Sequence, residues 1–345
     1  MKKNIQNLVG SLLFIGLALL ISVPIAYLLR PTASGNFRKP FVGFYAEEEN
    51  GLDMVLFGSS AAYRFISTPY LWEKFGITSY NLTTGSQPTG VLEALIEEVQ
   101  KSQNPQLYIV EVRRFLKDPA EKENTEVYLR RVTDNMNYSW NRTKLVLEES
   151  AGQEDRISYL FDLLKYHGEW EKIFRKSRLA YGDNKEAQPM KGWENIFEVK
   201  KIKKPKISGE VEMQELHEQA QEDLLDLINY CDEHKIDVLF LATPWKMSKE
   251  DAGRSRYLEK IVTSHGYTYL DCNLYYDEIG LDFSADFYDK KHVNVWGAEK
   301  VTQFVGDYIT ANYQVTGEHD EKTRQKWDAF AQMNREEIEE QICSQ

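Results

Sequence analysis

Residues 53–60 read Asp-Met-Val-Leu-Phe-Gly-Ser-Ser, and this stretch decides the fold because an apolar run ends there in a small polar turn. Runs of the same kind follow at 78–82 (TSYNL), 107–112 (LYIVEV), 237–243 (DVLFLAT) and 268–272 (TYLDC). Several are apolar on both faces, which is typical of strands buried in a parallel sheet. Helical patterns lie among them at 69–75, 88–102, 211–234, 249–265 and 298–313. This alternation predicts a doubly wound, flavodoxin-like α/β/α sandwich with a five-stranded parallel sheet in the order 2-1-3-4-5.

The gap between the third and fourth strand runs is too long for one crossover connection. Residues 113–209 should therefore hold a mostly helical insertion, and apolar spacing over 159–173 predicts one helix within it. The sheet domain would then span 51–315, and residues 316–345 read as an amphipathic helix carrying Trp327, Phe330 and Ile338.

The N-terminus has the composition of a membrane helix. Residues 4–29 contain no charged side chain, and residues 8–29 are almost wholly apolar. At ~1.5 Å per residue this run extends about 33 Å, enough to cross a bilayer and longer than the apolar core of a cleavable signal peptide. We therefore expect residues 1–30 to be a single-pass anchor and residues 31–50 a juxtamembrane segment. An uncleaved anchor ahead of a long domain favours a cytoplasmic N-terminus and an extracytoplasmic domain.

Composition excludes several classes of protein. The 345 residues carry 42 Lys and Arg against 54 Asp and Glu, a net charge of −12 that repels phosphate backbones, so we expect no nucleic-acid partner. The three cysteines, Cys231, Cys272 and Cys343, have no metal-binding spacing, so no metal and no cofactor are expected. A Cys231–Cys272 disulfide and free buried thiols both remain open, and free thiols are favoured.

Candidate catalytic residues follow the first strand run and precede the last helix. Open α/β sheets bind ligands at the carboxyl ends of their strands. Gly58-Ser59-Ser60 places a hydroxyl there, although serines are common in such turns for structural reasons alone. Asp289 and His292 are three residues apart, a spacing that lets the carboxylate accept a hydrogen bond from the imidazole Nδ1 while Nε2 faces a nucleophile. Ser60, Asp289 and His292 together form the pattern of a serine hydrolase.

These residues resemble those of the SGNH (GDSL-like) hydrolases and transferases, whose sheet opens with a Gly-x-Ser turn and whose last block is Asp-x-x-His. The resemblance implies that Ser60 is the nucleophile. The sequence resembles even more closely a membrane-anchored subgroup found with surface-polysaccharide genes in Firmicutes. It also resembles, more remotely, the DltD proteins of teichoic-acid D-alanylation. It covers about residues 42–330 and is carried by FGSSAAYR, LWEKFGITSYNL, KYHGEW and FYDKKHVNVWGAEKVT.

The chain departs from the family pattern in its two middle blocks. The glycine whose N–H joins the oxyanion hole corresponds to Gly85 or Ser86, beside the backbone N–H of Ser60. The Gly-x-Asn-Asp block is replaced by Val-Glu-Val-Arg-Arg at 110–114, so its asparagine donor is missing, a loss that typically costs ~10²–10³ in rate. Gln87 or Arg113 would compensate as substrate-binding donors.

Two further features have both a functional and a structural interpretation. His167 and Trp170 would line a sugar site, or else are packing residues of a helix. The basic run Lys200–Lys206 would contact an anionic polymer or lipid headgroups, or else is a solvated loop.

The activity that the resemblance implies is that of a serine esterase or O-acyltransferase working through an acyl-serine on ester groups, acetyl above all, of a cell-surface polysaccharide or teichoic-acid-like polymer. Its expected partners are that glycopolymer, the cell membrane and a membrane protein that donates the acyl group. The alternative is a non-catalytic polysaccharide-binding or scaffolding component, which the missing asparagine favours, whereas the joint presence of Ser60, Asp289 and His292 favours an enzyme.

Overall fold

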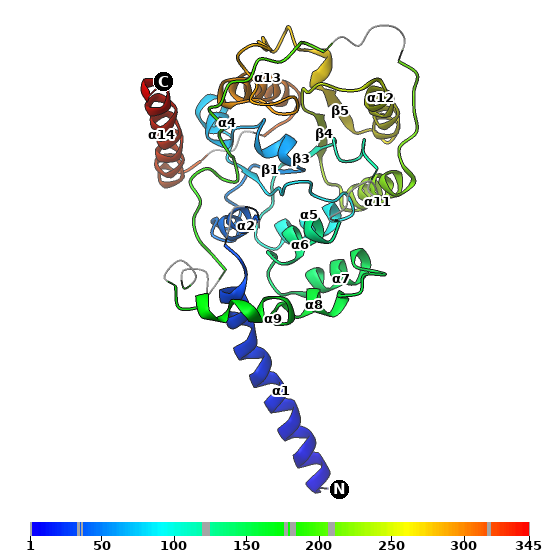
Figure 1. The fold of residues 1–345 in the computed structure, drawn as a ribbon, viewed down its shortest axis with the longest axis vertical. Coiled ribbons are helices and arrows are strands. Elements are labelled where there is room, and N and C mark those ends of the chain that lie inside the picture. Colours follow the sequence, from blue (N-terminus) through cyan, green and yellow to red (C-terminus); the bar gives the residue numbers. More distant parts are fainter. Residues whose placement is uncertain are drawn as a thin grey trace. The chain divides into compact units, whose positions relative to one another are not determined.

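A computed structural model describes residues 2–32, 35, 37–118, 125–175, 179, 184–205, 211–315 and 319–344 (Figure 1). The chain divides into two compact units. The helical unit comprises Met1–Ala46 and Arg130–Ala187, and the sheet unit comprises Glu47–Leu129 and Gln188–Gln345. Helix α6 (Thr125–Thr133) runs across the boundary between these two stretches of chain.

The sheet unit is built on five parallel strands. They are β1 (Met54–Phe57), β2 (Ser79–Asn81), β3 (Leu107–Glu111), β4 (Val238–Ala242) and β5 (Thr268–Asp271). Their order is β2-β1-β3-β4-β5, and every neighbouring pair is parallel. Each predicted run therefore forms a strand, and the predicted α/β fold and strand order are confirmed. The strands are one or two residues shorter than the predicted runs, with the difference at the first residue, the last residue or both.

Helices cover this sheet on both faces, as a doubly wound fold requires. The helices of this unit are α3 (Ser60–Tyr63), α4 (Thr68–Phe75), α5 (Leu92–Gln100), α11 (Glu218–His234), α12 (Lys249–Ser264), α13 (Val295–Asn312) and α14 (Glu321–Ser344), with a 3₁₀ turn η4 (Cys272–Leu274). Alternate strand residues such as Leu56 and Ile109 share one apolar core with Val301 of α13. The residues between them, such as Phe57 and Val110, are equally buried on the opposite face.

Local capping explains where several helices begin and end. The Asn294 side chain accepts a hydrogen bond from the Gly297 N–H, so α13 begins three residues before the predicted helix. Helix α4 ends at Gly76, which has a left-handed backbone (φ 67°). Helix α11 begins at Glu218, well after the predicted start at residue 211, and residues 211–217 form neither helix nor strand.

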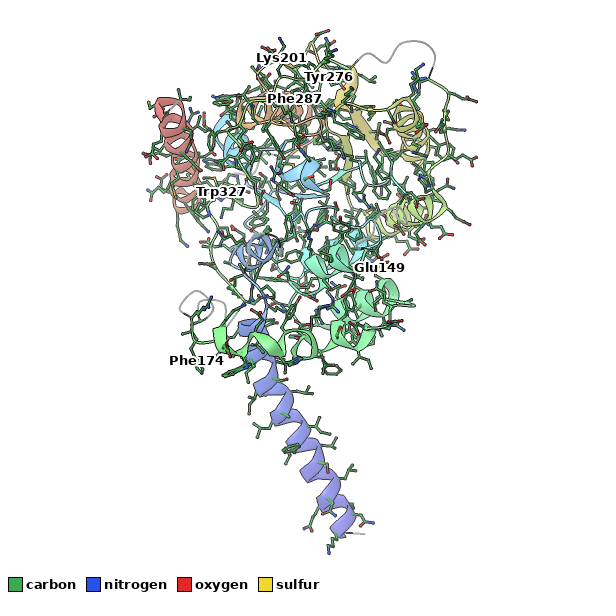
Figure 2. The ribbon with its side chains drawn as sticks, in the orientation of Figure 1. Glu149, Phe174, Lys201, Tyr276, Phe287 and Trp327 are labelled. Carbon is green, nitrogen blue, oxygen red and sulfur yellow. The ribbon has the colours of Figure 1, made fainter. Side chains whose placement is uncertain are left out.

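The tail forms a single helix, as the amphipathic pattern predicts. Helix α14 packs against α4, and the Trp327 ring lies 5.7 Å from the Trp72 ring (Figure 2). The Trp72 indole Nε1 donates to Asp328 at 2.8 Å. Cys231 and Cys272 are both free and buried, so the disulfide alternative is wrong.

A segment at 188–205 without helix or strand, which we call the strap, ties several parts of the sheet unit together through backbone hydrogen bonds. Lys191 O accepts from Asn81 N of β2 at 2.9 Å, and Ile196 O accepts from Val295 N at 2.8 Å. Lys200 N donates to Phe287 O at 2.7 Å. The strap therefore lies along the chain on both sides of His292. The basic run begins in it, and Lys206 falls outside the described residues.

The helical unit contains short helices and one long one. They are α1 (Lys2–Leu29), α2 (Arg38–Phe44), α7 (Trp140–Glu149), α8 (Arg156–Leu160), α9 (Asp162–Tyr166) and the 3₁₀ helix η3 (His167–Lys172). The single helix predicted over 159–173 is wrong, because the segment breaks at Phe161 (φ −124°, ψ 86°) and tightens into a 3₁₀ helix at His167. This break lets Asp162 turn inward while Phe161 stays exposed.

Buried charges join the end of α1 to the rest of the helical unit. Asp162 accepts hydrogen bonds from Arg30 Nε at 2.5 Å and from Arg142 Nη2 at 2.8 Å, and all three side chains are almost completely buried. Arg38 Nη1 donates to the carbonyls of Tyr27 at 2.6 Å and Arg30 at 3.1 Å, which satisfies the free end of α1.

Helix α1 is long and apolar enough to cross a membrane, with a mean hydropathy of 2.6 over its most apolar window. Its large side chains are exposed from Ile5 to Ile21, whereas Ala26 and Leu29 are buried in the helical unit. The last residues of the predicted 8–29 span are therefore covered by protein.

Candidate active site

The first candidate residue, Ser60, stands at the start of α3, directly after β1. Ser59 caps this helix by accepting from Ala61 N, and Gly58 makes the sharp turn out of the strand. Gly58 has φ 139°, and a Cβ atom there would lie 2.7 Å from the Glu111 Cβ of β3, so only glycine fits. This turn leaves Ser60 partly exposed at the carboxyl end of the sheet.

The second and third candidates, Asp289 and His292, sit in one tight loop before α13. An antiparallel bridge joins Phe287 to Val293, and Tyr288 N donates to His292 O at 3.2 Å. Within the loop, Asp289 Oδ1 accepts from the backbone N–H groups of Lys291 at 2.6 Å and His292 at 2.8 Å. These bonds hold the carboxylate beneath the imidazole.

The three side chains form a continuous hydrogen-bonded chain. Ser60 Oγ lies 2.7 Å from His292 Nε2 although the residues are 232 positions apart. His292 Nδ1 lies 2.9 Å from Asp289 Oδ2 and 3.1 Å from Oδ1. This is the geometry that the sequence predicts: a hydroxyl on one ring nitrogen and a carboxylate on the other. It allows His292 to accept the hydroxyl proton when Ser60 attacks a carbonyl carbon.

The surroundings keep His292 neutral. Burial, together with the positive charges of Arg113 and Arg64, lowers the pKa of His292 to about 4, although Asp289 opposes the shift. Burial raises the pKa of Asp289, but hydrogen bonds from His292 and from the backbone outweigh it, so that this pKa is lowered overall. At neutral pH the pair is therefore an imidazole beside a carboxylate, which is the form required of a general base.

This pKa predicts the pH dependence of any ester hydrolysis at the site. Below its pKa His292 carries a proton and cannot accept another, so kcat/KM should stay constant from pH 8 to about pH 5 and fall to half near pH 4. The measurement is kcat/KM for a small acetyl ester across this range, with the rate of the Ser60→Ala variant subtracted. A half-loss near pH 6.5, the ordinary value for histidine, would contradict the prediction.

The predicted oxyanion residues Gly85 and Ser86 lie in a turn after β2. Ser86 has a left-handed backbone (φ 59°), which is uncommon for serine, and Gln87 N donates to Thr84 O at 3.2 Å. The Gln87 side chain is buried and spans the turn, with Oε1 accepting from Gly58 N at 2.8 Å and Nε2 donating to Leu82 O at 3.3 Å. Gln87 thus joins the two turns that the oxyanion hole would need, and its substrate-binding role stays a prediction.

Glu111 and Arg113 occupy the place of the missing Gly-x-Asn-Asp block. Glu111 is buried under the Ser60 turn, where its carboxylate accepts from Ser59 Oγ at 3.4 Å and from Arg113 N at 3.1 Å. Arg113 Nη1 donates to Lys291 O at 2.9 Å, and Nη2 donates to Thr243 Oγ1 at 3.1 Å. Arg113 therefore braces the Asp289–His292 loop from β3, a contact that its predicted role in substrate binding does not include.

Two residues beside the triad were missed by the sequence analysis. The Tyr288 ring stacks on His292, with 5.5 Å between centroids and 12° between planes. Arg64 Nη1 donates to the Tyr288 hydroxyl at 2.6 Å and Nη2 to Glu194 of the strap at 3.2 Å. Tyr288 adjoins Asp289 and Arg64 follows Ser60 by four, so both lie within the recognised motifs, but neither spacing indicates that they meet.

His167 and Trp170 belong to η3 in the helical unit. His167 Nδ1 lies 3.1 Å from Leu164 O, and both side chains are exposed. Trp170 is therefore not a packing residue in this unit, and a sugar-binding role for the two stays a prediction.

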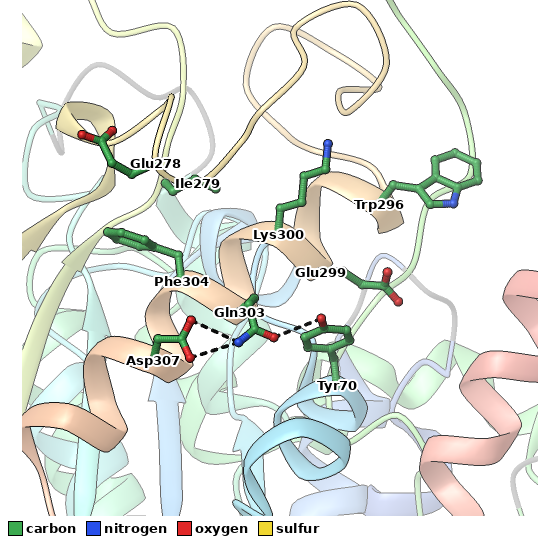
Figure 3. Close-up of a pocket in the computed structure, with 9 residues that line it drawn as sticks. All are labelled: Tyr70, Glu278, Ile279, Trp296, Glu299, Lys300, Gln303, Phe304 and Asp307. Carbon is green, nitrogen blue, oxygen red and sulfur yellow. Dashed lines mark hydrogen bonds between the residues drawn. The ribbon is translucent and has the colours of Figure 1, made fainter.

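A separate depression of about 360 Å³ lies on the sheet unit over α4 and α13 (Figure 3). It is lined by Tyr70, Glu278, Ile279, Trp296, Glu299, Lys300, Gln303, Phe304 and Asp307, none of which belongs to the triad. Within it Tyr70 donates to Gln303 at 3.2 Å, and Gln303 donates to Asp307 at 3.0 Å. Tyr70, Gln303 and Asp307 are thus bonded to one another, and Lys300 donates to Asp286 outside the depression.

In comparisons with known proteins, no protein-family model and no curated protein matches the chain.

Proposed function

We propose that this protein is a membrane-anchored serine esterase or O-acyltransferase that acts on ester groups, acetyl above all, of a cell-surface polysaccharide or teichoic-acid-like polymer. The observation that carries the proposal is the Ser60–His292–Asp289 hydrogen-bonded chain at the carboxyl end of a doubly wound sheet. Ser60 and His292 are too far apart in sequence for local structure to bring them together in this way. The low pKa of His292 leaves it neutral at physiological pH, as a general base in ester cleavage must be.

The mechanism follows from the geometry. His292 Nε2 takes the Ser60 proton as Oγ bonds to the ester carbonyl carbon, and the imidazolium then protonates the departing alcohol. Asp289 stabilises the imidazolium, and backbone N–H groups of Ser60 and of Gly85 or Ser86 would bind the oxyanion. The resulting acyl-serine passes its acyl group to water in an esterase or to a sugar hydroxyl in a transferase, and the same three residues serve both.

A second candidate is a non-catalytic binding or scaffolding component. It is favoured by the replacement of the asparagine donor with Glu111 and Arg113, whose side chains bond within the protein. The two candidates differ in whether Ser60 is reactive.

Reactivity is tested with a fluorophosphonate probe on the purified full chain in detergent. The esterase or transferase proposal expects a covalent adduct on the Ser60 peptide, found by mass spectrometry, and none in the His292→Ala variant, whose serine lacks its base. Ser264→Ala is the control, since this exposed hydroxyl of α12 bonds to the Ile261 carbonyl and not to His292, and its loss should leave labelling intact. No adduct on the wild-type chain would overturn the catalytic proposal in favour of the binding component.

The location is tested by protease added to intact cells. Helix α1 is the single candidate span in the described part of the chain, so residues 31–345 should be digested and a short membrane-protected fragment should remain. Cells permeabilised before digestion give the control for protease activity. Full protection of the domain in intact cells would exclude an extracytoplasmic substrate.

A further inference from the structure

The helical unit exposes several large apolar side chains within a short stretch of chain, and their exposure needs a physical explanation. Within α8, α9, η3 and the turn after it, the exposed fractions are Ile157 65%, Phe161 52%, Leu164 56%, Trp170 63% and Phe174 82%. We call these five residues the apolar collar. Soluble proteins seldom expose so many large apolar groups together, and such a patch usually marks an interaction surface.

The collar is carried by short helices and is not a disordered hydrophobic segment. Ile157 lies in α8, Phe161 at the break and Leu164 in α9, and all three side chains are exposed. Tyr159 and Asp162, from the same two helices, are instead buried in the unit. Asp162 holds this orientation through its bonds to Arg30 and Arg142.

Part of the collar lies beside the place where α1 leaves the helical unit. Helix α1 packs against α9 and η3, and Arg30, directly after α1, is bonded to Asp162 of α9. Figure 1 shows α8 and α9 running across the upper end of α1, and Figure 2 shows Phe174 at the edge of the unit beside that helix. Glu149, at the end of α7, lies on the side of the unit away from the exposed part of α1 (Figure 2).

The length of exposed helix sets where the collar must stand relative to a bilayer. Residues 3–21 of α1 project from the unit, and at ~1.5 Å per residue they extend about 28 Å. The hydrocarbon layer is about 30 Å thick. No exposed apolar helix is left to act as a spacer, so the surface that carries the collar must lie directly at the boundary between headgroups and acyl chains.

We propose that the apolar collar is a membrane-contact surface whose side chains insert into the headgroup and acyl boundary of the leaflet from which α1 emerges. The proposal goes beyond the enzymatic one and rests on α1 as a membrane span. Residues 156–175 carry four basic and three acidic side chains, so the charges nearly cancel and the attraction is apolar. An aromatic ring such as Trp170 suits this boundary. Collar and helix together hold the helical unit at a set height and tilt on the membrane.

Depth-dependent fluorescence quenching tests the contact on the full chain. An environment-sensitive fluorophore is attached to a single introduced cysteine, at Leu164→Cys or Phe174→Cys, in a Cys343→Ser background; the two remaining native thiols are buried and free. The protein is reconstituted into phosphatidylcholine vesicles with a shallow or a deep spin-labelled lipid, and iodide serves as the aqueous quencher. Glu149→Cys is the control in the same unit, and Leu13→Cys reports on α1.

At positions 164 and 174 we expect blue-shifted emission, strong quenching by the shallow lipid label and little by iodide, whereas position 149 should show the reverse. Position 13 should be quenched best by the deep label. Iodide quenching at 164 and 174 equal to that at 149, with position 13 still quenched by lipid, would overturn the collar alone. Loss of lipid quenching at position 13 would instead overturn the membrane span. Protection at 164 and 174 from both iodide and lipid would mean that a second copy of the chain covers the collar, which also overturns the proposal.

Discussion

Replacement of Ser60 by alanine, or of His292 by alanine, should each reduce kcat/KM for a small acetyl ester by roughly 10⁴–10⁶-fold, because nucleophile and base act as one unit. For the same reason the Ser60→Ala/His292→Ala double variant should be little slower than either single variant. Steady-state kinetics on the full chain in detergent measures all three. If the free-energy losses of the two single variants added up in the double variant, Ser60 and His292 would be acting independently, despite the 2.7 Å between Ser60 Oγ and His292 Nε2.

Asp289→Asn should reduce kcat/KM by roughly 10⁴-fold, since an amide no longer selects the imidazole tautomer that presents a bare Nε2 to Ser60. Lys290→Ala is the matched control, because this neighbouring side chain is exposed and should leave the rate unchanged. An Asp289→Asn variant as active as the Lys290→Ala variant would remove Asp289 from the triad.

Replacement of Asp162 by alanine should lower the free energy of unfolding of the helical unit by about 3–5 kcal/mol, because it strips two buried guanidinium groups of their counter-ion. Arg30 and Arg142 are nearly inaccessible and both bond to this carboxylate. Urea unfolding of the full chain in a mild detergent, followed by near-ultraviolet circular dichroism, measures the change. The free energy of unfolding of Asp162→Asn should fall between those of the wild-type chain and Asp162→Ala, since asparagine keeps a hydrogen-bond acceptor but loses the charge.

The control for this experiment is an ion pair in the same unit that is largely exposed. Lys172 Nζ lies 2.8 Å from Glu169, and exposed pairs typically contribute no more than about 1 kcal/mol. Glu169→Ala should therefore have little effect on unfolding. Equal effects of Asp162→Ala and Glu169→Ala would show that the buried cluster does not join α1 to α9.

The local pattern of apolar and polar residues was sufficient to predict the strands of the sheet unit. Four of the five strands are short, mostly apolar runs that can be recognised directly, and Gly58 marks the end of β1. Strand β2 is the more polar Ser-Tyr-Asn. The apolar length of α1 is likewise a property of consecutive residues. The Asp289–His292 spacing also predicted a pair, since three residues of a tight loop bring carboxylate and ring together whatever surrounds them.

The structure alone revealed what depends on residues far apart in sequence. The break at Phe161 goes with the inward turn of Asp162, which pairs with Arg30, a partner 132 positions away. The 159–173 pattern therefore looked like one helix. Arg113 braces the His292 loop through Lys291, 178 positions away, and the strap runs beside that loop through backbone groups, which have the same chemistry in every residue. The sequence by itself determined the five strands and the residue types of the Ser60–Asp289–His292 cluster, because these follow from local pattern and residue identity. Tertiary structure decided how the triad is supported and which apolar faces stay exposed, because burial and ion pairing depend on contacts that local sequence does not encode.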